Sequence, residues 1–212
     1  MNFIYPLTTF LQKNAVRLFA DYKVNGTENV PPIGPLIVIC NHQSNLDPYL
    51  LRTFISRRTW FLAKDELFNH SRIASRFLHS WGAFPLNRTG VDTRAYKWLI
   101  NLLDHDQVVV VFPEGTRSPG AMKKALSGVV RLAMRSQSPI LPVGIVGTEK
   151  LQAWYHVGYP KGHIRINIGE AFSLPQIDGR LSKDVLESLN DMMMSRVAEL
   201  LPEGYRGVYQ KI

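Results

Sequence analysis

The sequence predicts a single-domain α/β fold, in which a mainly parallel or mixed β-sheet is flanked by helices. The chain has 212 residues, 45% of them hydrophobic and 20% charged. This composition suits a globular domain of about one to one and a half typical lengths and excludes a disordered chain. Short β-branched runs alternate along the chain with segments whose apolar residues recur at helical spacing. Such alternation is typical of layered α/β proteins.

Short runs rich in β-branched residues are the expected strands. The fully apolar run LIVIC at 36–40 indicates a strand that is buried on both faces, in the middle of the sheet. The expected strands are residues 36–40, 59–63, 83–86, 108–112, 140–146 and 164–168.

Helices are expected between these strands and near the C-terminus. Residues 95–103 and 129–134 place apolar side chains at helical spacing. A long amphipathic stripe at 185–200 is bounded by Ser182, a residue type suited to the N-cap, and by Pro202, which ends a helix.

The first polar motif, NHQSNLDP, follows the strand at 36–40 directly. On a continuous helix His42 and Asp47 would point about 140° apart, so they can pair only if the turn folds back. We therefore expect the helix to begin near Asp47, with Pro48 at its first position. A carboxylate on one imidazole nitrogen leaves the other nitrogen free to take a proton from a hydroxyl. The alternative is that Asp47 is an ordinary N-cap and His42 an ordinary strand-end residue.

The second polar motif, FPEGTRSPG at 112–120, follows another expected strand. Loops at the carboxyl ends of strands are where α/β sheets bind ligands. Gly115 permits an unusual backbone conformation, and Arg117 could grip a phosphate through two hydrogen bonds. Glu114 could orient that arginine, accept a hydrogen bond from a substrate hydroxyl, or merely form a surface ion pair with it. A third segment, GAFPLNR, places Arg88 just beyond a strand.

These segments together resemble a known family. NHQSNLD, GAFPLNR, FPEGTRS and ILPVG, in this order over residues 41–144, resemble the four motifs of the glycerolipid acyltransferases. The resemblance is to the bacterial 1-acylglycerol-3-phosphate O-acyltransferase, or lysophosphatidate acyltransferase, family. The GEAFSLP segment at 169–175 is also similar to the C-terminal part of that family.

The resemblance implies a role for each matching residue. His42 matches the catalytic base and Asp47 the carboxylate that orients it, whereas Arg88 and Arg117 match arginines that contact phosphate. The acyl-acceptor loop is matched by Glu114, Gly115 and Thr116, and the fourth motif, linked with acyl-donor packing, includes Pro142.

The chain departs from the family pattern after its third motif. Many relatives have Phe-Lys-x-Gly there, whereas this chain has Ala-Leu-Ser-Gly at 125–128, with its lysines at Lys123 and Lys124. The departure leaves open whether Lys123 or Lys124 takes the place of the lysine in that segment.

The resemblance also implies the reaction. A fatty acyl group moves from a thioester of coenzyme A or acyl carrier protein to the sn-2 hydroxyl of 1-acylglycerol-3-phosphate, which gives phosphatidate. The thioester is a co-substrate, and we expect neither a metal nor another cofactor. Another lysophospholipid or glycerol-3-phosphate is the alternative acceptor.

Two rival functions have some support in the sequence. Cys40 or Ser44 could act as a covalent nucleophile, although Cys40 ends an apolar strand and Ser44 lacks the GxSxG elbow. The net charge is +8, and residues 52–135 hold 14 basic against six acidic side chains. A noncatalytic basic module that binds acidic lipid or nucleic acid is the other rival, but no recognised nucleic-acid motif is present, so we expect no nucleic-acid partner.

We expect a cytoplasmic protein that lies on the inner face of the cell membrane. The chain has one cysteine, its apolar runs are far shorter than the roughly 20 residues of a membrane span, and its N-terminus does not resemble a secretory signal. We expect residues 1–30 to form a helical, membrane-docking segment and residues 31–212 the acyltransferase domain. The candidate docking residues on an anionic membrane surface are Phe3, Ile4, Leu7, Phe10, Leu11 and the segment 71–81.

Overall fold

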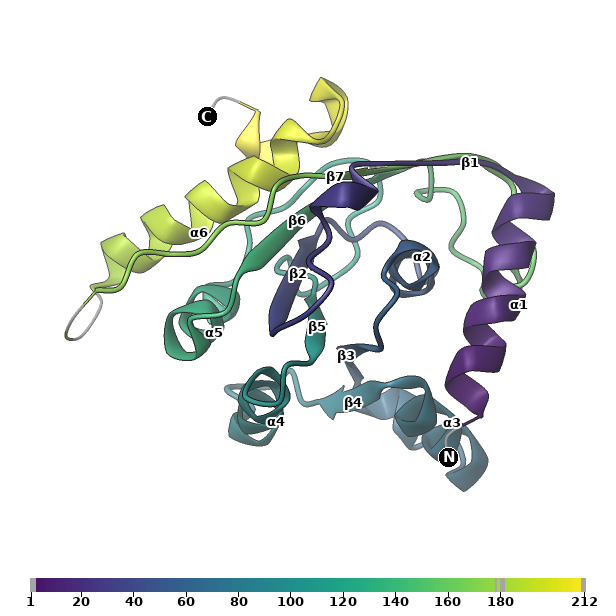
Figure 1. The fold of residues 1–212 in the computed structure, drawn as a ribbon, viewed down its shortest axis with the longest axis horizontal. Coiled ribbons are helices and arrows are strands. Elements are labelled where there is room, and N and C mark those ends of the chain that lie inside the picture. The colour runs from purple at the N-terminus through teal and green to yellow at the C-terminus, as the bar shows by residue number, and fades with distance from the viewer. Residues whose placement is uncertain (1–2, 178, 180–181, 211–212) are drawn as a thin grey trace.

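The structure is a computed structural model that describes residues 3–177, 179 and 182–210. Seven strands form one sheet in the order β1-β7-β6-β2-β5-β3-β4, and only β6 and β7 pair antiparallel (Figure 1). The strands are β1 (Ala20–Asn25), β2 (Leu36–Cys40), β3 (Thr59–Lys64), β4 (Ala83–Leu86), β5 (Val108–Val111), β6 (Ile140–Val146) and β7 (Gly162–Ile168). The predicted fold class, an α/β domain with a mainly parallel, mixed sheet, is confirmed.

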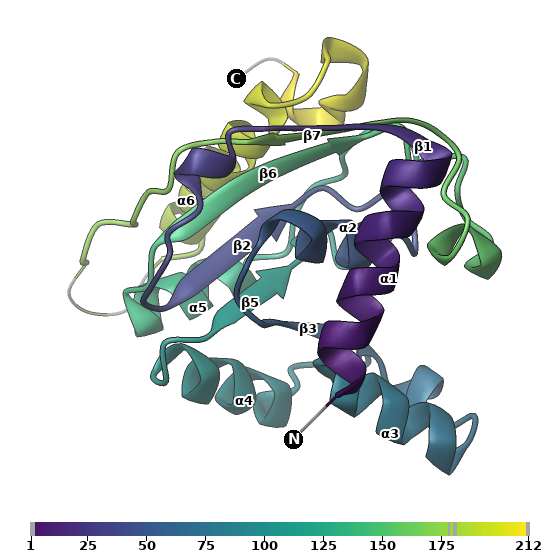
Figure 2. The same ribbon diagram turned by 45° about the vertical axis from the view of Figure 1, so that its right-hand side comes forward.

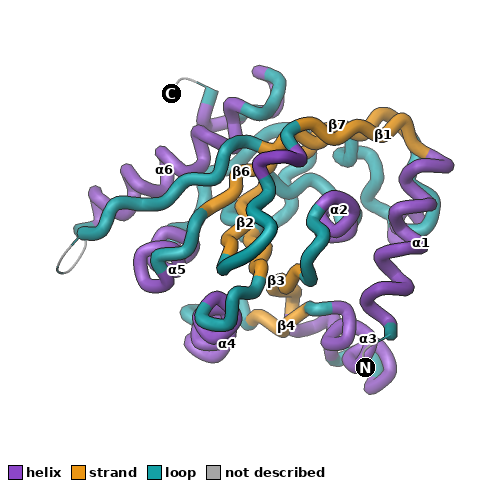
Figure 3. Tube along the Cα trace, in the orientation of Figure 1, coloured by secondary structure: helices purple, strands orange, loops and turns teal. Residues whose placement is uncertain are grey.

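Helices cover both faces of this sheet (Figure 3). They are α1 (Ile4–Phe19), α2 (Asp47–Phe54), α3 (Arg72–Trp81), α4 (Thr93–Leu103), α5 (Gly128–Ser136) and α6 (Lys183–Glu199). Alternate residues of β2 point to opposite faces. Val38 therefore packs in the core beneath α1 and α2, whereas Ile39 packs in the core beneath α4, α5 and α6.

All six expected strands are present, as are the three helices expected from apolar spacing, with ends shifted by a few residues. The stripe at 185–200 is α6, and the Ser182 hydroxyl caps it by accepting a hydrogen bond from the Val185 N–H. The helix expected near Asp47 is α2, although Pro48 is its second residue and not its first.

Two elements differ from the expectation. We expected residues 1–30 to be helical, but in the described part of that segment the α-helix covers Ile4–Phe19, Ala20–Asn25 form an edge strand of the sheet, and Thr27–Asn29 form a short 3-10 helix. The six residues ADYKVN alternate between half-buried and exposed, too short and too polar a run to stand out in the sequence. The segment 71–81, considered only for docking, is mostly the helix α3, which ends at Gly82 in a left-handed conformation (φ +100°).

The N-terminal helix α1 lies beside α2 and α3 on one face of the sheet (Figure 2). Arg52 of α2 holds it there, because the guanidinium lies 3.7 Å from the centre of the Tyr5 ring and donates a hydrogen bond to Thr9 Oγ1 (2.9 Å). No helix in the described ranges is long and apolar enough to cross a membrane.

Candidate active site

The first and second polar motifs meet at the carboxyl edge of the sheet. Strand β2 lies between β5 and β6, so Ile39 is opposite both Val111 and the buried Pro142. Because β2 and β5 are parallel, the residues that follow them emerge side by side. His42 and the loop after Phe112 are therefore neighbours. The His42 and Phe112 rings also stack, with 4.1 Å between the ring centres.

His42 and Asp47 form a hydrogen-bonded pair in which Nδ1 lies 2.8 Å from Oδ2. The same oxygen accepts hydrogen bonds from the backbone N–H groups of Gln43 (2.6 Å) and Ser44 (2.7 Å), which lie upstream of α2. Asp47 thus holds the turn that folds back and does not cap the helix, whose N-cap is Leu46. The alternative of an ordinary N-cap is wrong.

The Asp47 carboxylate is completely buried and has a further partner that the sequence analysis missed. Thr148, also completely buried, donates its hydroxyl to Asp47 Oδ1 over 2.8 Å. Thr148 follows β6, the other neighbour of β2, and its hydroxyl lies 3.4 Å from Gln43 Oε1. Four donors therefore surround one carboxylate, which satisfies the buried charge and fixes its orientation.

A second missed residue links the loop after β6 to both polar motifs. Gln152 donates from Nε2 to the backbone oxygen of Gln43 (2.6 Å) and accepts a hydrogen bond at Oε1 from Arg117 (3.3 Å). The sequence did indicate that the loop after β6 contributes to the site, because β6 reads as a buried strand whose carboxyl end lies at the same edge of the sheet as that of β2. Nothing in the sequence marked which residue of the loop makes the contact.

Glu114 lies beneath the histidine and is not on the surface. Its Oε1 accepts a hydrogen bond from the backbone N–H of His42 (3.0 Å), and its Oε2 accepts one from the backbone N–H of Lys123 (2.8 Å). The side chain is 6% exposed, and this burial raises the pKa of its carboxyl, which the two backbone donors partly oppose. The surface ion pair and the orientation of Arg117 by Glu114 are both wrong, because Arg117 bonds Gln152 instead.

Gly115 turns the loop away from Glu114. Its N–H donates to the Phe112 oxygen (3.0 Å), its φ is +67°, and a Cβ added there would lie 2.8 Å from Leu126 Cδ1. The left-handed backbone favours glycine here, whereas the exposed end of the Leu126 side chain could move aside for a Cβ. The exposed Thr116 and Arg117 follow, and the next amide, that of Ser118, donates to the His42 oxygen (2.6 Å).

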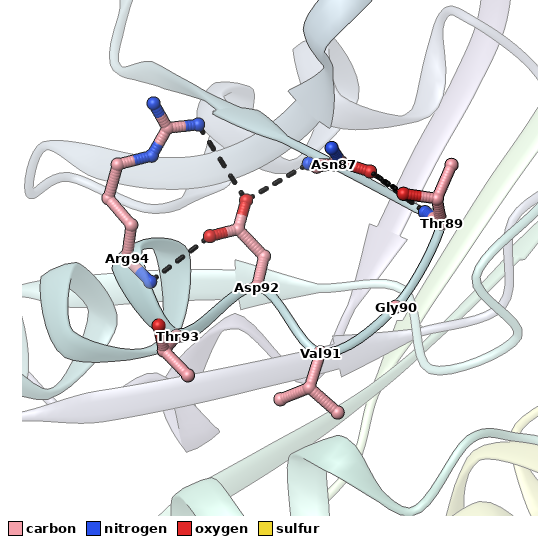
Figure 4. A pocket seen from close by; sticks show the side chains of 7 residues that line it. All are labelled: Asn87, Thr89, Gly90, Val91, Asp92, Thr93 and Arg94. Atoms are coloured by element: carbon pink, nitrogen blue, oxygen red, sulfur yellow. Dashed lines mark hydrogen bonds and ion pairs between the residues drawn. The ribbon is translucent and has the colours of Figure 1, made fainter.

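The structure does not bring Arg88 into contact with these residues. It follows β4, which is separated from β2 by β5 and β3, so about 14 Å of sheet lies between the two strands. In the loop that contains Arg88, Asp92 accepts hydrogen bonds from the backbone N–H groups of Asn87 and Arg94. Residues of this loop line a hollow of about 270 Å³ (Figure 4). Arg88 is exposed and makes no hydrogen bond within the described chain.

The two suggested nucleophiles are inaccessible. Cys40 is completely buried, and burial raises the pKa of its thiol well above the usual range. Ser44 is also completely buried, and its hydroxyl donates to the Leu151 oxygen while accepting a hydrogen bond from the Leu46 N–H (3.1 Å). A covalent mechanism through either residue is incompatible with this packing.

The basic excess of residues 52–135 is partly structural. Arg52 is 1% exposed, Arg57 donates to the oxygens of Gly34 and Pro31, and Arg58 donates to the Ser80 oxygen (2.9 Å). Among the aromatics interleaved with these arginines, Phe61 and Trp81 are buried. These side chains do not form an open platform for stacking bases.

The acyltransferase family model matches residues 21–146 of this chain, which is more than half of it and contains both polar motifs. The chain belongs to the acyltransferase family. The resemblance drawn from NHQSNLD and FPEGTRS is thereby confirmed.

Named relatives of this acyltransferase agree. It is 27% identical to the 1-acyl-sn-glycerol-3-phosphate acyltransferase of Bacillus subtilis over 93% of this chain and 96% of the relative. It is 26% identical to the enzyme of that name from Pseudomonas aeruginosa, over 85% of this chain and 70% of the relative. The crystal structure of the 1-acyl-sn-glycerophosphate acyltransferase from Thermotoga maritima superposes with a TM-score of 0.70 at 29% identity, covering 93% of this chain and 79% of that one.

Proposed function

We propose that this acyltransferase moves a fatty acyl group from a thioester carrier to the sn-2 hydroxyl of 1-acylglycerol-3-phosphate and so forms phosphatidate. The observation that carries the proposal is the His42–Asp47 pair, whose carboxylate is held by three further donors beside the loop of Glu114 and Arg117. The names of the relatives from Bacillus subtilis and Pseudomonas aeruginosa support this choice of acceptor.

In the proposed mechanism His42 is the general base. Because Asp47 accepts the Nδ1–H, the neutral ring carries its lone pair on Nε2, which has no hydrogen-bond partner among the described residues. Nε2 takes the proton of the sn-2 hydroxyl as that oxygen attacks the thioester carbonyl carbon. The tetrahedral intermediate then collapses, the carbon–sulfur bond breaks, and the thiolate receives the proton from Nε2.

The oxyanion of that intermediate requires hydrogen-bond donors. The N–H of Gly115 is not available, because it donates to the Phe112 oxygen within its turn. The next two amides, of Thr116 and Arg117, make no hydrogen bond within residues 3–177, 179 and 182–210. We take these two N–H groups as the candidate oxyanion donors, since their loop is bonded to the backbone of His42 through Ser118.

The decisive experiment gives the purified protein a panel of acyl thioesters and acceptors and identifies the products by mass. We expect the rate of acyl transfer to be highest with lysophosphatidate, which gives phosphatidate. Transfer to glycerol-3-phosphate or to lysophospholipids that have larger head groups should be slower. Faster transfer to any of these other acceptors would replace the proposed acceptor while leaving the acyl-transfer chemistry intact.

The arginines are proposed to hold the acceptor phosphate. Replacing Arg117 with alanine should raise the acceptor KM about tenfold, because one charge-assisted contact is lost, and should leave the thioester KM nearly unchanged. The loop geometry makes Arg117 the stronger candidate, so Arg88→Ala should have a smaller effect in the same assay. An increase confined to the thioester KM would assign the affected arginine to the carrier instead.

We also propose that this protein reaches its lipid substrate by docking on the inner surface of the cell membrane. Helix α1 exposes apolar side chains one helical turn apart, such as Leu7 (44% exposed) and Leu11 (57%). Helix α3, which packs beside it, exposes Ile73 (82%) next to the charged Arg72 and Arg76. Apolar side chains flanked by basic ones are suited to the interface of an anionic bilayer.

Binding to vesicles is therefore expected to depend on anionic lipid and on salt. It should weaken as the Debye length falls from about 10 Å at 0.1 M to about 3 Å at 1 M salt, while apolar insertion leaves a salt-resistant remainder. The double variant Arg72→Glu, Arg76→Glu should reduce cosedimentation more than it reduces turnover of a short-chain, water-soluble acceptor.

The matched control is Lys97→Glu, Arg135→Glu, which makes the same charge change on exposed residues of α4 and near the end of α5, under the other face of the sheet. It should leave vesicle binding nearly intact. Equal binding of the wild type to neutral and anionic vesicles at every salt concentration would refute electrostatic docking.

A further inference from the structure

A second cavity lies between the start of α5 and the first half of α6. It encloses about 420 Å³. Its lining includes Lys124, Leu126, Ser127, Arg131, Lys183 and Asn190. Neither His42 nor Asp47 borders it, so it is separate from the candidate active site.

The cavity is electrically suited to an anion. The first-turn N–H groups of any helix lack intrahelical partners, and in α5 the Ser127 side chain caps none of them and no acidic residue lies in that turn. Lys124 is neutralised by an ion pair with Glu187, which also lines the cavity. Arg131 and Lys183 form no ion pair in the described part of the chain, so the net charge of the lining is positive.

An incompletely paired buried side chain also borders this cavity. Asn190 is 2% exposed and donates from Nδ2 to the Ala125 oxygen (2.9 Å), but its Oδ1 has no partner among the residues described. A buried carbonyl oxygen without a donor costs free energy, so a ligand that supplies an N–H or O–H is favoured there. The cavity thus offers sites for an anion and for a neutral donor group.

The cavity is connected to the active site through one short stretch of backbone. Lys123 donates its N–H to Glu114, whose other oxygen holds the backbone of His42. Leu126, in the cavity wall, contacts Gly115 and donates its N–H to the Pro113 oxygen (2.8 Å). A ligand in the cavity therefore lies next to the acceptor loop, but its anionic end does not reach His42.

From this arrangement we propose that the cavity binds the phosphate end of the acyl carrier, with the amide and hydroxyl groups of a phosphopantetheine arm donating to Asn190. The proposal rests on the proposed acyl transfer. In the acceptor, the phosphate is only a few bonds from the hydroxyl that His42 must reach, so it cannot occupy a separate cavity. A carrier with a long arm can hold its thioester at His42 while its phosphate binds in the cavity.

The test compares coenzyme A, whose arm ends in phosphates and an adenosine, with pantetheine, which has neither. Coenzyme A and pantetheine share the thiol arm, and calorimetry measures their dissociation constants without any turnover. The variants Arg131→Ala and Lys183→Ala should each weaken coenzyme A binding about three- to tenfold and leave pantetheine binding unchanged. The control Arg135→Ala removes an exposed arginine from the last turn of the same helix, away from the cavity, and should change neither constant.

Kinetics provide the second measurement. In both variants the KM of acyl-coenzyme A should rise by the same factor, whereas the KM values of acyl-pantetheine and of lysophosphatidate should not change. Equal effects on coenzyme A and pantetheine, no effect on either, or a rise confined to the lysophosphatidate KM would overturn the proposal. Failure of the proposed function gives a different result, in which wild-type protein binds coenzyme A through the cavity but forms no phosphatidate.

Discussion

Replacing His42 with alanine is expected to reduce the kcat of acyl transfer by at least about 10²–10⁴-fold, the contribution of a general base, while the protein stays folded. The His42 side chain is 16% exposed, makes a hydrogen bond to Asp47 and stacks on the ring of Phe112. The buried carboxylate keeps its three other donors in the variant. Turnover at saturating substrates and the thermal midpoint should be measured together.

A second histidine variant serves as the control. His105 lies just after α4, and its ring makes a hydrogen bond with the Asn101 oxygen (2.7 Å) at an exposed position. His105→Ala should therefore retain wild-type kcat and a similar thermal midpoint. Near-normal turnover in a folded His42→Ala protein would rule out general-base catalysis by this residue.

Asp47→Asn is expected to lower kcat almost as much as His42→Ala, again with the fold retained. The amide oxygen can still accept from the backbone N–H groups of Gln43 and Ser44, and the amide nitrogen can donate to the Thr148 hydroxyl. The negative charge that stabilises the imidazolium during the reaction is lost, however. The KM values should change little, because Asp47 is completely buried and is not proposed to touch substrate.

Asp47→Ala separates catalysis from stability at the same position. It leaves the N–H groups of Gln43 and Ser44 buried without an acceptor, at about 1–3 kcal/mol for each, whereas the Thr148 hydroxyl still has Gln43 Oε1 at 3.4 Å. We therefore expect denaturant titration to give a much lower free energy of unfolding for Asp47→Ala than for Asp47→Asn. Similar stabilities for the two variants would contradict the observed hydrogen-bond network.

The threonine provides a graded version of the same test. Thr148→Val removes one donor from the carboxylate and should lower kcat about tenfold, the value of one hydrogen bond, with both KM values unchanged. Thr148→Ser restores the hydroxyl and should recover most of the activity. Failure of serine to recover it would show that the methyl packing of this residue matters and not its hydrogen bond.

The sequence predicted the central part of the fold well because buried parallel strands are continuous apolar runs. LIVIC at 36–40 and VVVV at 108–111 are such runs, and both form strands in the middle of the sheet. The edge strand β1 and the helix α3 were missed because each is exposed on one side and is short. Their stability comes from pairing with β7 and from packing beside α1, and neither contact leaves a local pattern.

The pairing of His42 with Asp47 was also predictable, because five residues of separation and a helix start restrict the turn to a few geometries. The sequence alone thus determined which two residues pair and the order of motifs around them. The environment of the pair was decided only by the tertiary structure. Thr148 lies 101 residues from Asp47 in the chain, and Glu114 lies 72 from His42. Sheet order brings these residues together, and which polar group meets which depends on strand register and burial, which local sequence does not encode.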